Sequence, residues 1–453
     1  MLFERIESEG LAHYSYLIGD QHEAIVIDPR RDCEVYVERA QRAGFRITDI
    51  LETHRNEDYV VGSLELAART DAKIWHADAE LDYQYGRPAE EGQQWAAGRL
   101  VLRAIATPGH TPGSMSYLLH DPDGNPWIVF TGDTLFAGDV GRVDLPGVDR
   151  KEEMAHLLYD SLFNKLLSLG DEVIVCPGHG SGSVCGSAIA ERIWTTIGLE
   201  CKLNPHLQYE DEATFVANVA QVLERPPYFR HVERWNLEGA PILGTLPMPM
   251  PLKPGAFAGR MDEALVLDTR LETSFGAAHV PEALSIWEGG LASFVGWFVP
   301  NDHPLLLVNA DDDPTPVVRT LIRLGYDDIV GSLAGGMLTW HMAGRPSAAV
   351  GLVTAQTLCQ RLEAGGKAWF LDVRSDEEIE AEGPLEGGHH VHITQLPDHV
   401  DSVPRDRPIY VFCGSGLRSM LGASVLQYRG MEDVHVVLGG TRAWESVACA
   451  KKP

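Results

Sequence analysis

Four short segments in the N-terminal half place histidine and acidic residues directly after an apolar run. They read THRNED from Thr53, TPGHTPGS from Thr107, TGDTLF from Thr131 and CPGHGSGS from Cys176. Imidazole nitrogens and carboxylate oxygens are donors with which proteins bind transition metals. A single histidine is more often an ordinary core or surface residue, but four such segments in succession indicate a metal centre.

A further candidate site lies near the C-terminus, where the apolar run PIYVF leads into CGSGLRS at residues 413–419. In a strand-to-helix turn of this kind, backbone N–H groups and the helix N-terminus favour an anion and lower the pKa of a thiol. Cys413 is therefore the candidate nucleophile, with a loop that cradles a sulfur or oxyanion group. The other six cysteines lack such a turn and are interpreted as small buried hydrophobes.

Apolar runs alternate with Gly- and Asp-rich turns over roughly the first 245 residues. Runs such as HEAIVIDP, PWIVFTGDTLF and DEVIVCPGHG predict buried strands that end in ligand-bearing loops. Between them, DRKEEMAHLLYDSLFNKLLSLG predicts a helix that Asp149 caps and Gly170 ends. Its apolar stripe of Leu158, Leu162 and Leu166 is expected to face the core.

A proline-rich segment, GTLPMPMPLKPGAFAG at 244–259, predicts a stiff linker, and an internal repeat follows it. LVLDTR around Asp268 recurs as WFLDVR around Asp372, and LAGGMLTW ending at Trp340 recurs as VLGGTRAW ending at Trp444. Both offsets are 104 residues (372 − 268 and 444 − 340), which indicates two copies of one α/β domain with parallel strands. The predicted domains are 1–245, 260–346 and 350–453, with a linker at 246–259.

The chain has 453 residues and a formal net charge of −28 at pH 7. Such a surface repels the phosphates of nucleic acids and anionic membranes, so neither is an expected partner. No apolar run of about 18 residues occurs, so no membrane span is expected, and the early acids of the N-terminal segment make a secretory leader unexpected. The seven cysteines lack a C-x-x-C pair. These features predict a cytoplasmic protein with reduced thiols.

The C-terminal copy resembles the rhodanese family of sulfurtransferases in CGSGLRS, LDVRS and VLGGTRAW. The resemblance covers about residues 350–453 and implies that Cys413 carries a sulfane sulfur as a persulfide. It implies an anion cradle made of Gly414, Ser415, Gly416, Leu417 and Arg418. The first copy has Asn309 and Pro314 at the equivalent positions, and three aspartates would repel an anion. Residues 260–346 are thus expected to form a rhodanese-like domain without the catalytic cysteine.

The N-terminal segments resemble the metallo-β-lactamase superfamily, whose corresponding turn is T-H-x-H-x-D-H. Here Asn56 and Tyr59 replace the second and the last histidine. In two-zinc hydrolases of the superfamily, one metal uses positions 54, 56 and 110, and the other uses positions 58, 59 and 179. Each zinc would therefore lose one ligand. What remains is the two-histidine, one-carboxylate set of non-haem Fe(II) oxygenases, with ligands His54, His110 and Asp133.

The persulfide dioxygenases are a branch of the superfamily with this ligand set. LFAGDVGRVDL and PGHGSGSVCG resemble the versions fused to rhodanese domains, and the resemblance spans nearly the whole chain. It implies an αββα metallo-β-lactamase sandwich followed by two α/β rhodanese domains with parallel sheets. It also implies one Fe(II) per chain, Arg142 near the substrate cleft, and a homodimer or homotetramer.

The implied reaction is the oxidation of a low-molecular-weight persulfide, such as glutathione persulfide, by O₂ to sulfite and thiol, as in sulfide detoxification. Sulfur would pass between this reaction and Cys413 as persulfide, thiosulfate or sulfite, in a direction that the sequence leaves open. Tyr59 either fills the volume of the lost histidine or hydrogen-bonds toward the cleft, and His179 either orients a ligand or serves only the structure.

Two other interpretations stay open. A thioester hydrolase resembling glyoxalase II would use zinc-bound hydroxide and would turn over S-lactoylglutathione without oxygen. A metal-free scaffold that carries a single sulfurtransferase would bind no transition metal. Metal content, measured beside oxygen uptake with glutathione persulfide, separates the three.

Overall fold

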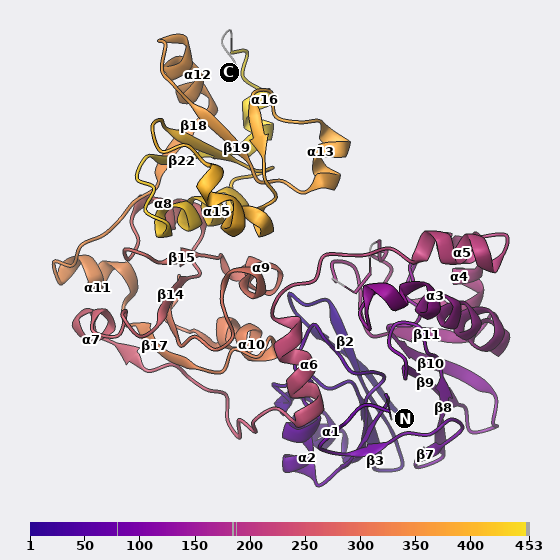
Figure 1. Ribbon diagram of the computed structural model, residues 1–453. Coiled ribbons are helices and arrows are strands. Elements are labelled where there is room, and N and C mark those ends of the chain that lie inside the picture. Colours follow the sequence, from indigo (N-terminus) through magenta and orange to yellow (C-terminus); the bar gives the residue numbers. More distant parts are fainter. Residues whose placement is uncertain (79, 184, 187, 450–453) are drawn as a thin grey trace. The chain divides into compact units, whose positions relative to one another are not determined.

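The computed structural model describes residues 1–78, 80–183, 185–186 and 188–449 and divides into two compact units (Figure 1). Unit 1 comprises Met1–Leu246 with Ile322–Gly325, and unit 2 comprises Pro247–Leu321 with Tyr326–Pro453. None of the helices in the described part of the chain combines the length and the apolar character needed to cross a lipid bilayer.

Unit 1 is built on two six-stranded sheets, ordered β1-β2-β3-β4-β5-β6 and β12-β11-β10-β9-β8-β7. The strands of the first sheet are β1 (Leu2–Ser8), β2 (His13–Asp20), β3 (Glu23–Ile27), β4 (Arg46–Leu51), β5 (Lys73–His76) and β6 (Arg87–Pro88). Those of the second sheet are β7 (Gln94–Ala97), β8 (Leu100–Ala106), β9 (Met115–His120), β10 (Pro126–Gly132), β11 (Ile174–Pro177) and β12 (Thr195–Thr196). Both sheets are mixed, since β3 runs antiparallel to β2 and parallel to β4, and β10 runs antiparallel to β9 and parallel to β11.

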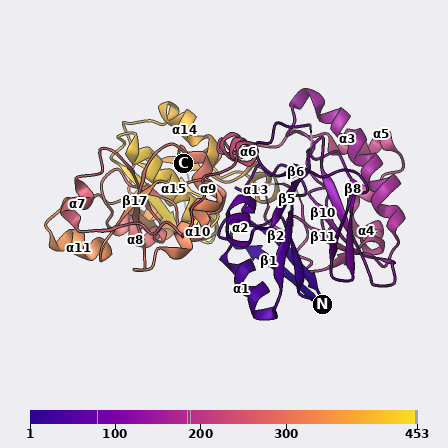
Figure 2. The same cartoon turned by 90° about the horizontal axis from the view of Figure 1, so that it is seen from below.

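Apolar side chains of both sheets pack together in one core that includes Tyr16, Tyr117 and Phe130. A second core joins the first sheet to α1 (Glu34–Ala43) and α2 (Ser63–Thr70), and a third joins the second sheet to α3 (Lys151–Asp160) and α5 (Glu212–Val219). Each fully buried large apolar side chain contributes about 1.5–3 kcal/mol. The layers therefore follow the order αββα, which confirms the predicted sandwich (Figures 1 and 2). The remaining α-helices of unit 1 are α4 (Ile197–Leu203) and α6 (Phe229–Glu238).

The helical segment predicted after Asp149 forms, but not as one regular α-helix. Its start differs from the prediction, because Asp149 lies in a 3-10 turn, η1 (Val148–Arg150), and no side chain caps α3. A π-helical segment, η2 (Ser161–Leu166), and a 3-10 turn, η3 (Leu167–Leu169), follow α3. The predicted stripe of Leu158, Leu162 and Leu166 is fully buried. Ser161 Oγ donates to the carbonyl of Pro108 at 2.7 Å, so the π-helical segment is fastened to the loop that carries His110.

Unit 2 contains two parallel five-stranded sheets, ordered β13-β17-β16-β14-β15 and β18-β22-β21-β19-β20. If the five strands of each sheet are numbered along the chain, their order across the sheet is 1-5-4-2-3 in both sheets. The strands are β13 (Pro251–Leu252), β14 (Leu265–Asp268), β15 (Leu284–Ser285), β16 (Leu305–Val308), β17 (Ile329–Leu333), β18 (Gly351–Thr354), β19 (Trp369–Asp372), β20 (Gly388–His390), β21 (Ile409–Phe412) and β22 (Val434–Leu438). The pairs β14 and β19, and β16 and β21, are each offset by 104 residues (369 − 265 and 409 − 305).

Helices connect the parallel strands of unit 2. In the first copy they are α7 (Pro254–Ala258), α8 (Glu272–Ala277), α9 (Leu291–Phe298), α10 (Thr315–Arg323) and α11 (Gly336–Met342). In the second copy they are α12 (Ala355–Glu363), α13 (Asp376–Glu382), α14 (Leu396–His399), α15 (Leu417–Tyr428) and α16 (Gly440–Glu445). One ion pair recurs at the same offset, because Arg270 binds Asp268 and Arg374 binds Asp372, each through two guanidinium nitrogens.

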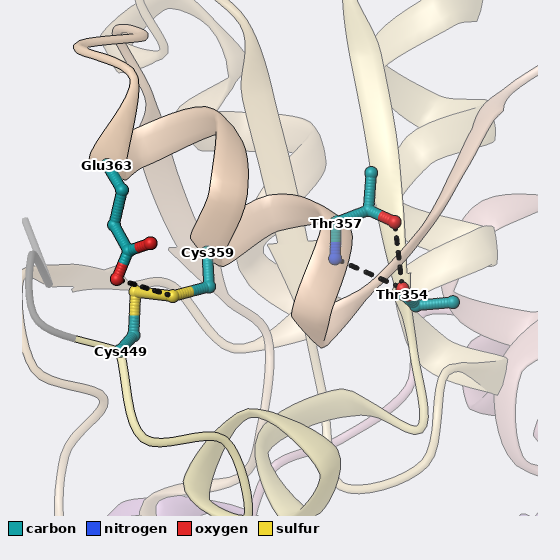
Figure 3. Close-up of a disulfide and its surroundings, with 5 residues drawn as sticks. All are labelled: Thr354, Thr357, Cys359, Glu363 and Cys449. Atoms are coloured by element: carbon teal, nitrogen blue, oxygen red, sulfur yellow. Dashed lines mark hydrogen bonds between the residues drawn. A yellow bond between two sulfur atoms is a disulfide. The ribbon is translucent and has the colours of Figure 1, made fainter.

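A disulfide joins Cys359 of α12 to Cys449, so the expectation that all cysteines are reduced thiols is wrong (Figure 3). Thr354 caps the N-terminus of α12 by accepting a hydrogen bond from the N–H of Thr357. The two cysteines are 90 residues apart in sequence, and only the packing of the C-terminal segment on α12 brings their Cα atoms to 5.5 Å. The free cysteines of the described residues are Cys33, Cys176, Cys185, Cys201 and Cys413.

The Cys359→Ser variant is expected to lower the free energy of unfolding of the C-terminal domain by about 2–4 kcal/mol, because a cross-link across a long loop restricts the unfolded chain. Denaturant titration of the variant beside wild type and Cys201→Ser measures the loss. In denaturant without reductant, a thiol reagent should detect five thiols, against the seven cysteines of the sequence after reduction. Seven thiols under both conditions would contradict the disulfide.

Candidate functional site

Loops that follow three strands of unit 1 bring the predicted ligands together. His54 follows β4, His110 follows β8, and Asp133 follows β10. Asp133 Oδ2 lies 3.8 Å from His54 Nε2 and 3.6 Å from His110 Nε2. All three side chains are at most 2% exposed, so their polar atoms have no access to bulk water.

Glu57 is a fourth donor at this position that the sequence analysis missed. Its Oε1 lies 3.1 Å from His110 Nε2, and Glu57, His54 and His110 each offer one ligand atom within 4.8 Å of the others. Despite this short distance, no group among the described residues donates to either Glu57 oxygen with the angles of a hydrogen bond. Glu57 directly follows Asn56, which stands where the superfamily turn has a histidine. A carboxylate next to a lost ligand was the signal available in the sequence.

Three histidines are held through Nδ1 and leave Nε2 without a hydrogen-bond partner among the described residues. His54 Nδ1 lies 2.9 Å from the hydroxyl of Thr53, and His110 Nδ1 lies 2.9 Å from the carbonyl of Arg142. His179 Nδ1 lies 2.8 Å from Asp133 Oδ1. Since a carbonyl or carboxylate requires the proton on Nδ1, the neutral form of the imidazole has its lone pair on Nε2, as in metal-binding histidines.

The charges of the cluster compensate one another in the absence of a cation. Burial opposes the charged form of His110, but Glu57 and Asp133 outweigh it and raise the pKa of His110 to about 9. Burial likewise opposes charge on Asp133, yet His179 and His54 hold the pKa of Asp133 well below its usual range. The same balance, dominated by His110, lowers the pKa of Glu57. The cluster therefore holds ionised carboxylates opposite positive charge.

A second cluster adjoins the first through His179. Asp58 Oδ2 lies 2.9 Å from His179 Nε2, and Asp58, His179 and Cys185 each offer a ligand atom within 4.8 Å of the others. All three are buried. Burial raises the pKa of the Cys185 thiol well above its usual value, and Asp58 adds to the effect. The sequence analysis treated Cys185 as a small hydrophobe, although it lies in the same loop as His179.

Tyr59 does not take the place of the histidine that it replaces. Its ring lies against that of His13 in a tilted arrangement, with ring centroids 3.9 Å apart, and is farther from the ring of His179, at 6.3 Å. The side chain is fully buried, and its hydroxyl has no hydrogen-bond partner among the described residues. Tyr59 thus packs against the neighbouring strand β2, which begins at His13.

Helix α6 holds the turn that carries His54, Glu57 and Asp58. Asn236 Nδ2 donates to the carbonyls of Asn56 and Tyr59 at 2.7 and 2.9 Å. Its Oδ1 accepts from the N–H of Val61 at 3.0 Å, and Tyr228 Oη donates to the carbonyl of Asp58 at 2.8 Å. One buried amide therefore satisfies three backbone groups of an irregular turn.

Two glycines allow the backbone to approach Asp133. A Cβ atom on Gly141 would lie 1.8 Å from the carbonyl oxygen of Asp133, and one on Gly178 would lie 2.5 Å from Asp133 Oδ1. Both distances are shorter than any tolerated contact, so these positions require glycine if Asp133 is to keep its place.

Arg142 lies beside the site but does not present its charge to it. Its guanidinium binds Asp144 through two nitrogens at 2.7 Å and donates to the carbonyls of Leu223 and Glu224. Only its backbone carbonyl reaches the site, where it binds His110 Nδ1. These contacts favour a structural role for the Arg142 guanidinium, as the partner of Asp144, over a contact with substrate.

In unit 2, Cys413 follows β21 and is fully buried. The N–H of Gly416 donates to Cys413 Sγ at 3.0 Å, so one backbone donor of the loop faces the sulfur. Gly416 has φ +123°, and α15 begins at the next residue, Leu417. The turn between Cys413 and α15 consists of Gly414, Ser415 and Gly416. Both ends of the loop thus have the predicted geometry.

Arg418 forms an ion pair with Glu378 through two nitrogens at 2.5 Å. The Glu378 carboxylate also accepts from the N–H of Ser375, the N-cap residue of α13. The hydrogen bonds from the Arg418 guanidinium lower the pKa of the Glu378 carboxylate to about 2. Arg418 is half-buried beside the Cys413 loop, so Glu378 fixes the cation that the sequence predicts for anion binding.

The first copy keeps the framework of this loop without the thiol. Asn309 follows β16 as Cys413 follows β21, and Gly336 and Gly440 have φ values of +57° and +58°. A Cβ on Gly440 would lie 1.8 Å from the carbonyl of Cys413, so glycine is required there. In the first copy, Thr269 Oγ1 donates to Asn309 Oδ1 at 3.0 Å.

Comparison with known proteins gives two family matches. The family model described as the metallo-beta-lactamase superfamily matches residues 9–179, and that of the rhodanese-like domain matches residues 354–447. Hydroxyacylglutathione hydrolase GloC of Haemophilus influenzae is 27% identical over 214 residues, covering 43% of this chain and 91% of that protein. The mitochondrial persulfide dioxygenase ETHE1 of Bos taurus is 30% identical over 205 residues, covering 43% and 71%.

A crystal structure of a metallo-beta-lactamase from Staphylococcus aureus superposes on the chain with a TM-score of 0.65 and 28% identity. It covers 74% of this chain and 98% of that one, so the likeness extends beyond the N-terminal domain. The sequence relatives include both a hydrolase and a dioxygenase, so sequence similarity does not distinguish between these two reactions.

The Glu57→Gln variant is expected to bind a divalent metal at the His54–His110–Asp133 site on the order of 10- to 100-fold more weakly, because an amide cannot supply the negative charge of the carboxylate. Competition with a chromophoric chelator measures the affinity. Glu152→Gln, a change at an exposed position of α3, is the matched control. Equal affinities of the two variants would exclude Glu57 from the donor set.

His110 gives the metal-free protein a stability that depends on pH. Since its pKa rises from about 6.5 in the unfolded chain to about 9 in the fold, its contribution is complete below pH 6.5 and is lost as the pH rises through 9. The melting temperature of chelator-treated protein should therefore fall over this range, and less so in His110→Asn. An identical fall in both proteins would assign the effect to other groups.

Proposed function

The chain belongs to the metallo-beta-lactamase superfamily and carries a rhodanese-like domain, and on this premise we propose that it is an iron-dependent persulfide dioxygenase coupled to sulfur transfer at Cys413. One observation carries the proposal. A buried site with two unpartnered imidazole nitrogens and facing carboxylates shares a chain with a cysteine loop built for sulfur.

The donor set fits iron. His54, His110 and Asp133 would hold the metal, and Glu57 lies where it can add a second carboxylate. Imidazole and carboxylate donors without a thiolate suit Fe(II), and unpartnered buried nitrogens are costly unless a cation binds them. The same cost argues against a metal-free scaffold. When bound, Fe(II) would supply the activation of O₂ for transfer to sulfur.

The protein's own residues set the geometry for that chemistry. Thr53 and the carbonyl of Arg142 orient His54 and His110 through Nδ1. The hydroxyl of Thr53 in turn donates to Asp28 Oδ2 at 2.7 Å, so it accepts from the imidazole. Burial of the ligands excludes water and strengthens every charge interaction in the site.

The proposed oxidation consumes one persulfide, one O₂ and one water, and yields one thiol, one sulfite and two protons. The outer sulfur is oxidised while O₂ is reduced, and the sulfur–sulfur bond is broken.

Cys413 would exchange sulfur with the same compounds. With thiosulfate as donor, the thiolate attacks the outer sulfur, a Cys413 persulfide forms, and sulfite leaves. A thiol acceptor then takes that sulfur as its own persulfide and restores the Cys413 thiolate. The N–H of Gly416, which contacts Cys413 Sγ, and Arg418, which is paired with Glu378, would stabilise the anions of both steps. In the reverse direction, sulfite would accept the sulfur to form thiosulfate.

A zinc-dependent thioester hydrolase is the second candidate. The cluster of Asp58, His179 and Cys185 favours it, because it offers donors for a second metal beside the first. A dinuclear centre could activate water for hydrolysis. The relative from Haemophilus influenzae, by its name, hydrolyses hydroxyacylglutathione.

Oxygen uptake by iron-loaded protein with glutathione persulfide tests the proposed function. We expect uptake with sulfite formation, loss of both by at least 100-fold in His110→Ala, and no turnover of S-lactoylglutathione. Zinc-loaded protein that hydrolyses the thioester, with no oxygen uptake by the iron form, would establish the rival reaction.

The Cys413→Ser variant separates the two halves of the proposal. It should lose thiosulfate sulfurtransferase activity because the hydroxyl cannot carry sulfane sulfur, while its oxygen uptake with glutathione persulfide stays within about twofold of wild type. Cys201→Ser, a change of a half-buried free cysteine in unit 1, is the control. Sulfur transfer that survives in Cys413→Ser would assign the carrier role to another cysteine.

A further inference from the structure

Unit 2 contains a cluster of donor side chains that the proposed sulfur chemistry does not use. Cys359, Glu363 and Cys449 each offer one ligand atom within 4.8 Å of the others. Cys359 Sγ lies 3.6 Å from Glu363 Oε1, and Figure 3 shows the Glu363 carboxylate turned toward the disulfide. Two sulfur atoms and one carboxylate therefore converge where the C-terminal segment packs on α12.

Helix α12 places two of these donors on one face. Cys359 and Glu363 are four residues apart, a spacing at which helical side chains lie one above the other. Glu363 is the last residue of the helix. Because the carbonyl end of a helix carries a partial negative charge, the helix itself adds to the attraction for a cation at this position.

The cluster is accessible from solution. Cys359 is 5% exposed, but Cys449 is half-buried and Glu363 is exposed. Cys449 lies beyond α16 and outside the helices and strands, so its segment can shift without disrupting either. A small thiol or a hydrated ion can therefore approach the sulfur pair from the side of Cys449 and Glu363.

Reduction converts the cross-link into two potential ligands. Low-molecular-weight thiols open a disulfide by exchange, in which two of them lose two electrons and join as a disulfide while Cys359 and Cys449 each gain a proton. The two protein thiols then lie beside the Glu363 carboxylate. Ionisation of either thiol would place like charges together, which a bound cation compensates.

We propose that the reduced pair of Cys359 and Cys449 binds a divalent, thiophilic cation such as zinc, with Glu363 as the third ligand. On binding, two metal–sulfur bonds replace the two S–H bonds, and two protons pass to solvent. Thiolates and a carboxylate form a zinc donor set, and water takes the fourth tetrahedral position. The metal then fastens the C-terminal segment to α12 in reducing surroundings, as the disulfide does in oxidising ones.

Cobalt(II) titration of the full-length protein in its oxidised and its reduced form tests the site, because the five free cysteines are thiols in both forms. The reduced form is prepared with a phosphine, which is then removed under anaerobic conditions. We expect the reduced form to bind one more equivalent than the oxidised form, with an additional near-ultraviolet sulfur-to-cobalt charge-transfer band. Cys449→Ser should give the same stoichiometry and spectrum in both forms, whereas Cys201→Ser should retain the difference.

The Glu363→Gln variant tests the third ligand without removing the cross-link from the oxidised form. It should shift the additional binding step to a cobalt concentration higher by on the order of tenfold. Glu386→Gln, a change at an exposed position elsewhere in unit 2, is the matched control and should leave that step in place. The proposal would be overturned by a reduced form that binds no more cobalt than the oxidised form, by a difference that persists in Cys449→Ser, or by equal affinities of the two glutamine variants.

Discussion

Asp133 holds a negative charge where water does not reach it, and each of its oxygens faces a different group of donors. One oxygen lies within 3.8 Å of His54 and His110, and the other binds His179 at 2.8 Å. A buried carboxylate is stable only when positive charge and hydrogen bonds compensate for lost hydration. The four loops at the strand ends place the compensating groups around Asp133. Gly141 and Gly178 leave the space that Asp133 needs to reach them.

Two histidines are missing from the turn, but the cavity has not lost its donors. Glu57 lies next to one lost position, and Cys185 approaches from another loop near the other. Neither lies at a substituted position, since Asn56 and Tyr59 stand there. The Glu57 carboxylate, whose pKa is lowered, adds negative charge beside His110, which strengthens the attraction for a divalent cation in a medium of low dielectric constant.

Apolar runs and the turns that follow them are local signals, and they predicted buried strands that end in polar loops, as well as the repeat offset. The αββα layers and the proposed ligand set of His54, His110 and Asp133 came from the family resemblance, and the structure brings these three side chains together. Glu57 belongs to the same turn, but it was not predicted as a donor. The family pattern differs from this turn at Asn56 and Tyr59, and it assigns no ligand to position 57. Cys185 and the disulfide were missed for a different reason. Both depend on loops or helices that meet only after folding, and no spacing in the sequence encodes a contact over 90 residues. Residue type alone likewise could not predict that the Arg142 side chain pairs with Asp144.

The second copy in unit 2 holds sulfur in two chemical forms, a free thiol at Cys413, which is the proposed carrier, and a cross-link between Cys359 and Cys449. The segment that the cross-link closes contains the carrier. Small thiols that accept sulfur from a persulfide are also the nucleophiles that open disulfides. The thiol concentration of the surroundings therefore sets two quantities together, the rate at which the carrier is discharged and the fraction of molecules whose domain remains cross-linked. The same small thiols would therefore affect both the sulfur transfer and the stability of this domain.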